Sequence, residues 1–416
     1  SGSSVTGDRA GPTIENTIIT RCTIIARNGR AAGAGLSCMN VVPTVRDSTI
    51  ELCSAVSRRG DTYGGAVHVL DGGLTMTGST LAHCSAVCLE SAWYSYAFGG
   101  GLYLVASGSD SLTLEDSQIL GCSCSVHASN GQVRAAGMLL AHSARTAVDK
   151  NTMTVKRCII AECTAIHQGS GSVIAAAVSF LYVACLLEDV KIQGCTAMGD
   201  RVYGGAMYAS SATLTFRRCE VNSCAAIARG ATGTAFGGGL LLYGSAAFEN
   251  SSFFNCSARS ITGNAMGGAI DVSSSGSATM TRSSITSSSA ISTTVSSGRG
   301  EGGGVAVRGG KLRMVSGSFL QHNSASHSGN SLIITGDVTY VFPAAPGTWI
   351  AGRSCKVYRE ACEGQDMPDA LGGSEACLRT QEECSLQTNR SVTIDGTICR
   401  EPLFIQPCDC ELLQRR

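Results

Sequence analysis

Apolar and polar residues alternate in short segments through most of the chain, as in Leu74-Thr75-Met76-Thr77. A period of two residues is typical of a β-strand with one buried face, and no stretch keeps a helical period over three turns. Glycine, aspartate and serine separate the alternating segments. The pattern therefore predicts an all-β chain of short strands joined by turns.

A longer unit repeats on top of this alternation. It has a polar or small residue first, an aliphatic residue three positions later and a cysteine six positions later, followed by serine or threonine and alanine. The copies are spaced by 29 residues (Asp189 to Arg218) to 41 residues (Asp116 to Arg157). This spacing suits one coil of a parallel β-helix. The first positions are Asn16, Asp47, Gly78, Asp116, Arg157, Asp189, Arg218, Asn250, Arg282 and Gly317.

A second mark, two small residues followed by an aliphatic one, keeps step with the first, as in Gly100-Gly101-Leu102. We expect three strands of four to six residues in each coil and one loop between the cysteine-containing strand and the next glycine pair. The paired glycines should mark a turn with positive φ or a close backbone approach. The loops, for example 87–98 and 166–174, should stack on one side and offer a recognition surface.

These marks divide the chain into three parts. We predict a flexible segment over 1–13, a parallel β-helix of about ten coils over 14–337 and a small cysteine-rich module over 338–416. Ten coils at a strand spacing of about 4.8 Å would form a rod on the order of 50 Å long.

Equivalent positions of successive coils should form columns. The first column is of cysteine: Cys22, Cys53, Cys84, Cys122, Cys163, Cys195, Cys224 and Cys256, continued by Ser288 and Asn323. One interpretation is a file of small buried side chains. The other is vertical disulfides between some neighbouring coils, because the expected Cα separation permits a bridge.

The first position of the repeat forms a second column, which alternates in charge at Asp116, Arg157, Asp189 and Arg218. Stacked opposite charges compensate one another, so we interpret this column as a structural charge ladder. The alternative is an acidic catalytic or calcium site, which needs several carboxylates without intervening guanidinium groups. The sequence predicts no cofactor.

The tail differs in composition from the repeats. Seven cysteines stand within 56 residues that contain few apolar residues: Cys355, Cys362, Cys377, Cys384, Cys399, Cys408 and Cys410. This density predicts a disulfide-stapled module that covers or extends the last coil.

Composition and sequons indicate the compartment. The chain has 21 cysteines, a net charge of zero and glycosylation sequons at Asn250, Asn255 and Asn389, which together favour an extracellular location. Asn250 is the better acceptor because Asn255 adjoins the cysteine column. The zero net charge argues against a nucleic-acid partner, and the chain has no membrane span. Because no signal peptide is present, we expect a piece of a longer protein.

Other polar and aromatic residues show no catalytic pattern. The residues Tyr63, Phe98, Tyr203 and Phe236 precede glycine pairs, where we expect packing, with a carbohydrate-binding strip as the alternative. The seven histidines are scattered without metal spacing and are expected at the surface or in turns. Loop carboxylates do not recur in pairs, so we do not expect an enzyme.

The repeats resemble those of the chlamydial polymorphic outer-membrane proteins. Gly267-Gly268-Ala269-Ile270 matches their Gly-Gly-Ala-aliphatic mark, and Phe253-x-x-Cys256 corresponds to their Phe-x-x-Asn mark with cysteine in place of asparagine. The resemblance implies a right-handed, pectin-lyase-like β-helix with a surface or adhesive role. The tail, for example 355–362, resembles tails of large algal cell-surface proteins.

The expected function is an extracellular structural or adhesive β-helix, a subunit or fragment of a coat, appendage or filament. Its partners would be other subunits or copies of itself, bound through the coil ends or the loop stack, with glycans as a further class. The rival interpretation is a polysaccharide lyase or hydrolase, or a glycan-binding β-helix, because fold alone does not assign function.

Overall fold

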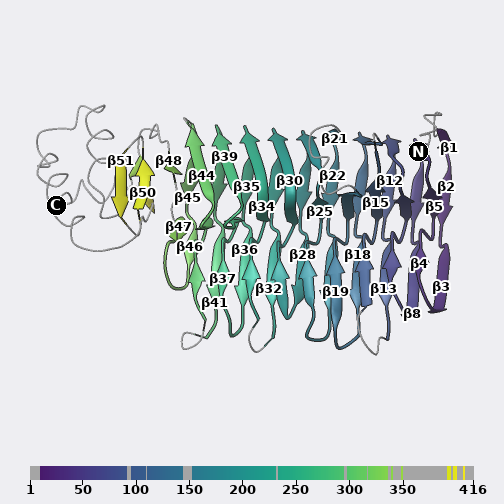
Figure 1. Cartoon of the computed structure of the whole chain (residues 1–416), viewed down its shortest axis with the longest axis horizontal. Coiled ribbons are helices and arrows are strands. Elements are labelled where there is room, and N and C mark those ends of the chain that lie inside the picture. Colours follow the sequence, from purple (N-terminus) through teal and green to yellow (C-terminus); the bar gives the residue numbers. More distant parts are fainter. Residues whose placement is uncertain are drawn as a thin grey trace, which may run out of the picture.

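The computed structural model shows a parallel β-solenoid whose coils stack along one axis (Figure 1). The described residues are 10–90, 95–108, 110–143, 152–230, 233–294, 298–315 and 317–335, with short tail strands between 339 and 407. Among them there is no helix, and the strand pairs of the solenoid are parallel. The predicted all-β parallel β-helix is confirmed, with about nine coils.

One coil passes through five strands in four sheets. In the second coil, β6 (Val42–Arg46) lies in sheet A, β7 (Thr49–Glu51) in sheet B, β8 (Ser54–Arg59) in sheet C and β9 (Thr62–Tyr63) in sheet D, before β10 (Val67–Leu70) returns to sheet A. The expectation of three strands and one loop in each coil was wrong in detail. Sheet D occupies the segment predicted as loop, because strands of two to four residues are too short to show a clear period.

Sheets B, C and D each contribute one strand to a coil. Sheet B contains β2 (Ile18–Thr20), β7, β12 (Thr80–Ala82), β17 (Gln118–Leu120), β22 (Ile159–Ala161), β27 (Lys191–Gln193), β31 (Glu220–Asn222), β35 (Ser252–Phe254), β40 (Ser284–Thr286) and β45 (Phe319–Gln321). Sheet C contains β3 (Thr23–Asn28), β8, β13 (Ser85–Cys88), β18 (Ser123–Val126), β23 (Thr164–His167), β28 (Thr196–Gly199), β32 (Ala225–Ala228), β36 (Ser257–Ser260), β41 (Ser289–Ser292) and β46 (Ser324–Ala325). Sheet D contains β4 (Ala31–Ala32), β9, β14 (Ser95–Phe98), β19 (Gly131–Arg134), β24 (Ser172–Ile174), β29 (Arg201–Tyr203), β33 (Ala235–Phe236), β37 (Ala265–Met266) and β42 (Gly300–Glu301).

Sheet A contributes two rows of strands. The row that follows sheet D contains β5 (Leu36–Met39), β10, β15 (Leu102–Ala106), β20 (Met138–His142), β25 (Val178–Leu181), β38 (Ile270–Val272), β43 (Val305–Arg308) and β47 (Leu332–Thr335). The row that precedes sheet B contains β1 (Ala10–Glu15), β6, β11 (Leu74–Thr77), β16 (Leu112–Glu115), β21 (Thr152–Lys156), β26 (Ala184–Glu188), β39 (Ser277–Thr281) and β44 (Lys311–Val315). The longer strands β30 (Met207–Arg217) and β34 (Leu240–Glu249) run through both rows.

The core is a set of continuous files along the axis. Register pairs Ile50 with Leu81 and Leu81 with Ile119, so equivalent side chains of neighbouring coils pack directly on one another. This packing removes apolar surface from water along the whole rod, at about 25 cal/mol for each Å². The inner file of sheet B, in which each side chain is at most 1% exposed, contains Ile50, Leu81, Ile119, Ile160, Ile192, Val221, Phe253, Ile285 and Leu320.

Left-handed residues make the corners of the coils. Between sheets D and A, Gly64 has a φ of 54°. A Cβ atom on the next residue, Gly65, would collide with the carbonyl oxygens of Gly100 and Ser85. The glycine pair therefore marks both a positive φ and a close backbone approach, as predicted.

The predicted cysteine column lies in consecutive coils, because register pairs Ser85 with Ser123 and Ser123 with Thr164 immediately after it. The fourteen described cysteines carry free thiols, and the column is buried except at Cys22, which is part-exposed. The column is therefore a file of small side chains without vertical disulfides among the described residues.

The thiols of this column also hydrogen-bond in the turns. The backbone N–H of Cys53 donates to Sγ of Cys84 (3.4 Å), whose thiol donates to the carbonyl of Ala82 (3.2 Å). At the far end the N–H of Cys256 donates to Oγ of Ser288 (3.2 Å). The N–H of Ser288 in turn donates to Oδ1 of Asn323 (2.9 Å). Serine and asparagine can replace cysteine at the end of the column because each is small and accepts a hydrogen bond from a turn N–H.

The strand pairing of the solenoid reaches upstream of residue 14, where the β-helix was predicted to begin. The first strand begins at Ala10 and pairs with β6, with a register irregularity between Ala10 and Thr13. Pro12 interrupts the regular pairing there, which explains why alternation predicted a later start. Residues 1–9 lie outside the described residues.

The tail contains the short strands β48 (Thr339–Tyr340), β49 (Thr348–Trp349), β50 (Ser391–Ile394), β51 (Thr397–Arg400) and β52 (Gln406–Pro407). β48 pairs parallel with β50, which pairs antiparallel with β51. Of the tail cysteines, Cys355, Cys362, Cys377, Cys384, Cys408 and Cys410 lie outside the described residues, and only the backbone of Cys399 is described. The predicted disulfide module stays a prediction.

Candidate functional site

The charge ladder forms on the corner between sheets A and B. Arg157 binds Asp116 through two hydrogen bonds, Nε to Oδ1 (2.6 Å) and Nη2 to Oδ2 (2.8 Å). Arg218 binds Asp189 in the same way, at 2.7 and 2.8 Å. These four residues have φ values between 48° and 55°, so the left-handed turn projects each side chain outward.

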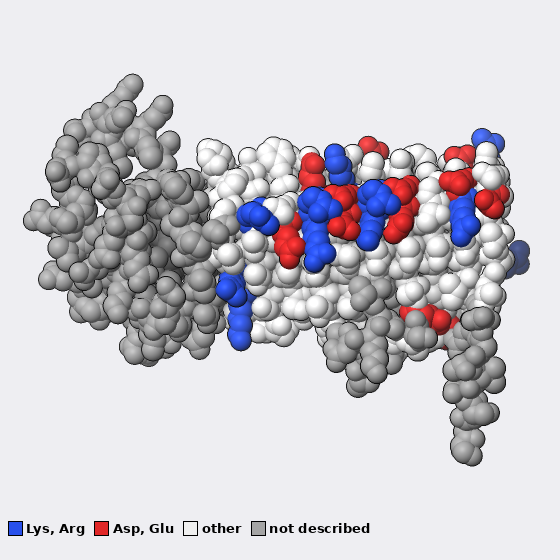
Figure 2. All heavy atoms as spheres, turned by 90° about the horizontal axis from the view of Figure 1, so that it is seen from above, with Lys and Arg blue, Asp and Glu red and all other residues white. Residues whose placement is uncertain are grey.

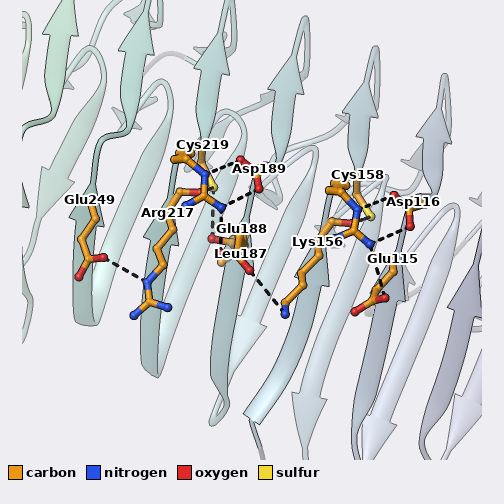
Figure 3. A network of polar contacts seen from close by, with 12 residues as sticks. Glu115, Asp116, Lys156, Cys158, Leu187, Glu188, Asp189, Arg217, Cys219 and Glu249 are labelled. Atoms are coloured by element: carbon orange, nitrogen blue, oxygen red, sulfur yellow. Dashed lines mark hydrogen bonds and ion pairs between the residues drawn. The ribbon is translucent and has the colours of Figure 1, made fainter.

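A second file of alternating charge, which the sequence analysis missed, runs beside this ladder. It occupies the last position of the sheet A strands: Glu115, Lys156, Glu188, Arg217 and Glu249 (Figure 3). Lys156 Nζ lies 3.5 Å from Oε2 of Glu188. Arg217 Nε lies 3.1 Å from Oε2 of Glu249. The two files are joined, because Nη2 of Arg218 also binds Glu188 at 2.9 Å.

The charge ladder and the second file together form a charged band, in which acidic and basic side chains compensate one another. Figure 2 shows acidic and basic side chains alternating along the axis on this side of the solenoid. Hydrogen bonds from Arg157 hold the pKa of Asp116 below its usual range, and Arg218 does the same for the pKa of Asp189, with Arg157 contributing. Since these groups are exposed, each pair adds little to stability. The band agrees with the structural interpretation, because its carboxylates are engaged by guanidinium and ammonium groups.

The two described sequons lie at either end of β35: Asn250 at the corner between sheets A and B, and Asn255 at the corner between sheets B and C. Asn250 is exposed at the charged corner and has a φ of 48°. Asn255 is also exposed, but its Nδ2 donates to Oγ of Ser223 at 3.1 Å. Asn250 therefore remains the better predicted acceptor, while Asn389 lies outside the described residues.

A strip of aromatic rings runs along a different corner, where sheet D meets sheet A. The rings predicted to stack do so in two groups. Tyr63 lies 5.5 Å from Phe98, and Tyr203 lies 5.7 Å from Phe236, between ring centroids. Outward-facing residues of the adjoining row of sheet A add rings that the sequence analysis missed. We call these residues the aromatic strip: Tyr63, Phe98, Tyr103, Tyr203, Tyr208, Phe236 and Tyr243, all of them part-exposed.

The strip packs outside the main core. Ala135, Leu139 and Ala141 form a separate buried cluster with Phe98 and Tyr103 against it. These side chains point away from the coil interior, since they follow the outward register of sheet A and the adjoining corner. The corner between the two sheets is therefore apolar on its outer side.

An ion pair with a fully buried carboxylate lies at one end of the strip. Nε of Arg308 lies 3.0 Å from Oδ1 and 3.1 Å from Oδ2 of Asp271, and Asp271 is 0% exposed. The guanidinium carbon of Arg308 lies 4.4 Å from the ring centroid of Phe236. Burial raises the pKa of Asp271 to about 6 although Arg308 acts in the opposite direction. A charged residue inside the strand Ile270–Val272 was the sequence signal for this site.

Arg134 lies farther along the same strip and has no such partner in the part of the chain that the structure describes. Its guanidinium carbon lies 6.0 Å from the centroid of Phe98 and 5.9 Å from that of Tyr208. Its Nε is enclosed and has no hydrogen-bond partner among the described residues. Burial lowers the pKa of Arg134, and only tyrosines oppose this effect. The sequence analysis did not single out this residue.

The histidines only partly follow expectation. His68, His142 and His167 are buried, which corrects the prediction of surface or turn positions, while His83 is exposed at a turn. The ring of His68 stacks on Tyr103 at 5.3 Å, and its Nδ1 lies 3.2 Å from Oγ of Ser37. The part of the chain that the structure describes contains no cluster of three or more histidine, cysteine or acidic side chains arranged for a metal ion.

Comparison with known proteins gives no relative: no protein family, no curated protein and no solved structure matches the chain. Among the described residues there is also no helix long and apolar enough to cross a membrane.

Proposed function

We propose that the protein is an extracellular structural or adhesive solenoid, a subunit or fragment of a surface coat, appendage or filament. The observation that supports this most is the unbroken in-register stack, in which polar side chains mainly serve neighbouring coils. The charged band pairs along the axis, and the thiols hydrogen-bond in the turns. Such a rod is suited to spacing and connecting partners.

The resemblance to the chlamydial surface-protein repeats, with its right-handed β-helix, supports the same proposal. An oxidising compartment is compatible with the free solenoid thiols. Burial raises the pKa of thiols such as Cys256, and a protonated thiol reacts slowly with oxidants.

The first coil is the proposed assembly contact. Among the described residues, β2 and β3 have a paired strand on one side only. Near this edge Ile18 is 72% exposed and Ile25 is 71% exposed. Strand edges of this kind pair with further strands. We propose that a second copy covers this edge, so that solenoids join end to end.

The test is sedimentation equilibrium and electron microscopy of the full chain. We expect concentration-dependent end-to-end oligomers, which the double variant Ile18→Lys/Ile25→Lys should abolish because edge lysines block strand pairing. Phe254→Lys is the control, since Phe254 is 45% exposed on β35, which has a paired strand on both sides. A wild-type chain that stays monomeric at all concentrations would contradict the proposal.

The second candidate function is glycan binding, with polysaccharide cleavage as its enzymatic form. The part-exposed rings of the aromatic strip favour binding, because aromatic faces pack against the C–H groups of sugar rings. Incubation of the protein with polysaccharides tests cleavage, and release of reducing ends would replace the structural proposal.

A further inference from the structure

Arg134 is a cation that has no counterion among the described residues, in surroundings where a counterion would be favourable. No carboxylate among the described residues forms an ion pair or hydrogen bond with it, and its Nε is enclosed without a partner. A partly desolvated charge is costly unless it is paired. The residue is nevertheless part-exposed, so a group from solution has access to it.

The same strip shows how this chain neutralises an arginine when it does so internally. Arg308 also packs on a ring of the strip, Phe236, and the buried carboxylate of Asp271 binds its Nε. At Arg134 the neighbouring groups are rings, Phe98 and Tyr208, which attract the cation but do not neutralise it.

We propose that Arg134 and the surrounding rings form a binding site for a saccharide that carries a carboxylate or a sulfate. The oxyanion would supply Arg134 with the negative charge that Asp271 supplies to Arg308, because a guanidinium donates hydrogen bonds to the oxygens of carboxylates and sulfates. The sugar rings would lie on the aromatic faces that follow one another along the axis.

The backbone around the site favours a saccharide over a peptide. Strand β19, which carries Arg134, pairs with β14 on one side and β24 on the other, and β20 pairs with β15 and β25. An extended peptide usually binds a sheet by adding a strand to a free edge. Neither β19 nor β20 has a free edge, so no strand can be added at this site. A saccharide needs no such edge, because it can bind through stacking on the rings and one charged contact. The inference does not rest on end-to-end assembly, and a monomeric protein would leave it intact.

The experiment is isothermal titration calorimetry of the full chain with a glucuronate-containing oligosaccharide, its sulfated form and its carboxyl-reduced neutral form. We expect binding of at least one acidic form and at least tenfold weaker binding of the neutral one. Hexaglutamate is titrated in the same way, to compare an acidic peptide with the acidic saccharides.

Arg134→Met keeps the apolar stem and should weaken binding of the acidic saccharide at least tenfold, and Arg134→Lys should restore it only in part. Arg157→Met, which removes a guanidinium from the charge ladder, is the matched control and should bind like the wild type. Thermal denaturation of each variant checks folding. Equal affinity for the neutral form, unchanged affinity in Arg134→Met or tighter binding of hexaglutamate would each overturn the proposal.

Discussion

Arg308 and Arg134 lie on one aromatic strip but in opposite electrostatic surroundings. Arg308 contacts Phe236 and the fully buried Asp271, while Arg134 lies near Phe98 and Tyr208 with no acidic partner among the described residues. Both are part-exposed. In similar apolar surroundings, Arg308 therefore stabilises the fold through its carboxylate partner, whereas Arg134 is available to a ligand under the proposal above.

The charge ladder on the other corner provides a third situation. There Arg157 and Asp116 bind each other with 51% and 55% of their side chains exposed, so water screens both partners. Solvent exposure, rather than the number of hydrogen bonds, should therefore rank the effect of removing each arginine.

Removal of Arg308 should have the largest effect. Arg308→Met leaves the carboxylate of Asp271 buried and unpaired, which should lower the free energy of unfolding by about 3 to 5 kcal/mol at neutral pH. Urea denaturation followed by circular dichroism measures the change. The double variant Arg308→Met/Asp271→Asn should regain much of the loss, and a double variant as unstable as the single one would show that the pair is not the cause.

The stability of the wild type should also depend on pH through Asp271. Burial raises its pKa in the folded state to about 6 from an ordinary value of 3.8. Between these values the folded chain binds a proton that the unfolded chain has released, so stability should fall as pH rises through this window. The free energy of unfolding of the wild type minus that of Asp271→Asn should fall by no more than about 3 kcal/mol between pH 4 and 7. If this quantity rose with pH instead, the assigned direction of the pKa shift would be wrong.

Removal of Arg134 should change stability little. Arg134→Met gives up cation–π attraction but also removes an unpaired, partly buried charge, so the free energy of unfolding should stay within about 1 kcal/mol of the wild type. The same urea titration measures it, side by side with Arg308→Met. A loss as large as that of Arg308→Met would mean that Arg134 has a structural role like that of Arg308.

The smallest effect is expected on the exposed ladder. Arg157→Met should lower the free energy of unfolding only slightly at low salt, because water screens the exposed pair. The difference should shrink in 1 M NaCl, because salt screens exposed charges over about 3 Å. A loss that persists at high salt would show that the aliphatic stem of Arg157, rather than its charge, is what the coil needs.

Much of the fold could be predicted because equivalent positions of consecutive repeats lie next to one another in the solenoid. Asp116 and Arg157 are equivalent positions of consecutive coils, so the spacing alone placed them together, and the same holds for Cys53 and Cys84. The strands of sheet D were missed because Thr62–Tyr63 and its equivalents are too short to show a period.

The sequence by itself thus determined the axial order: the coils, the files of equivalent residues and the alternating charges at the corners. Only the tertiary structure decided which non-equivalent positions meet across a corner, such as Arg134 with Tyr208 and Arg308 with Phe236. The physical reason is that stacking places equivalent residues together, so the spacing of the repeats predicts it. Contacts across a corner depend on the angle between two sheets and on the length of the side chains, and the repeat pattern contains neither.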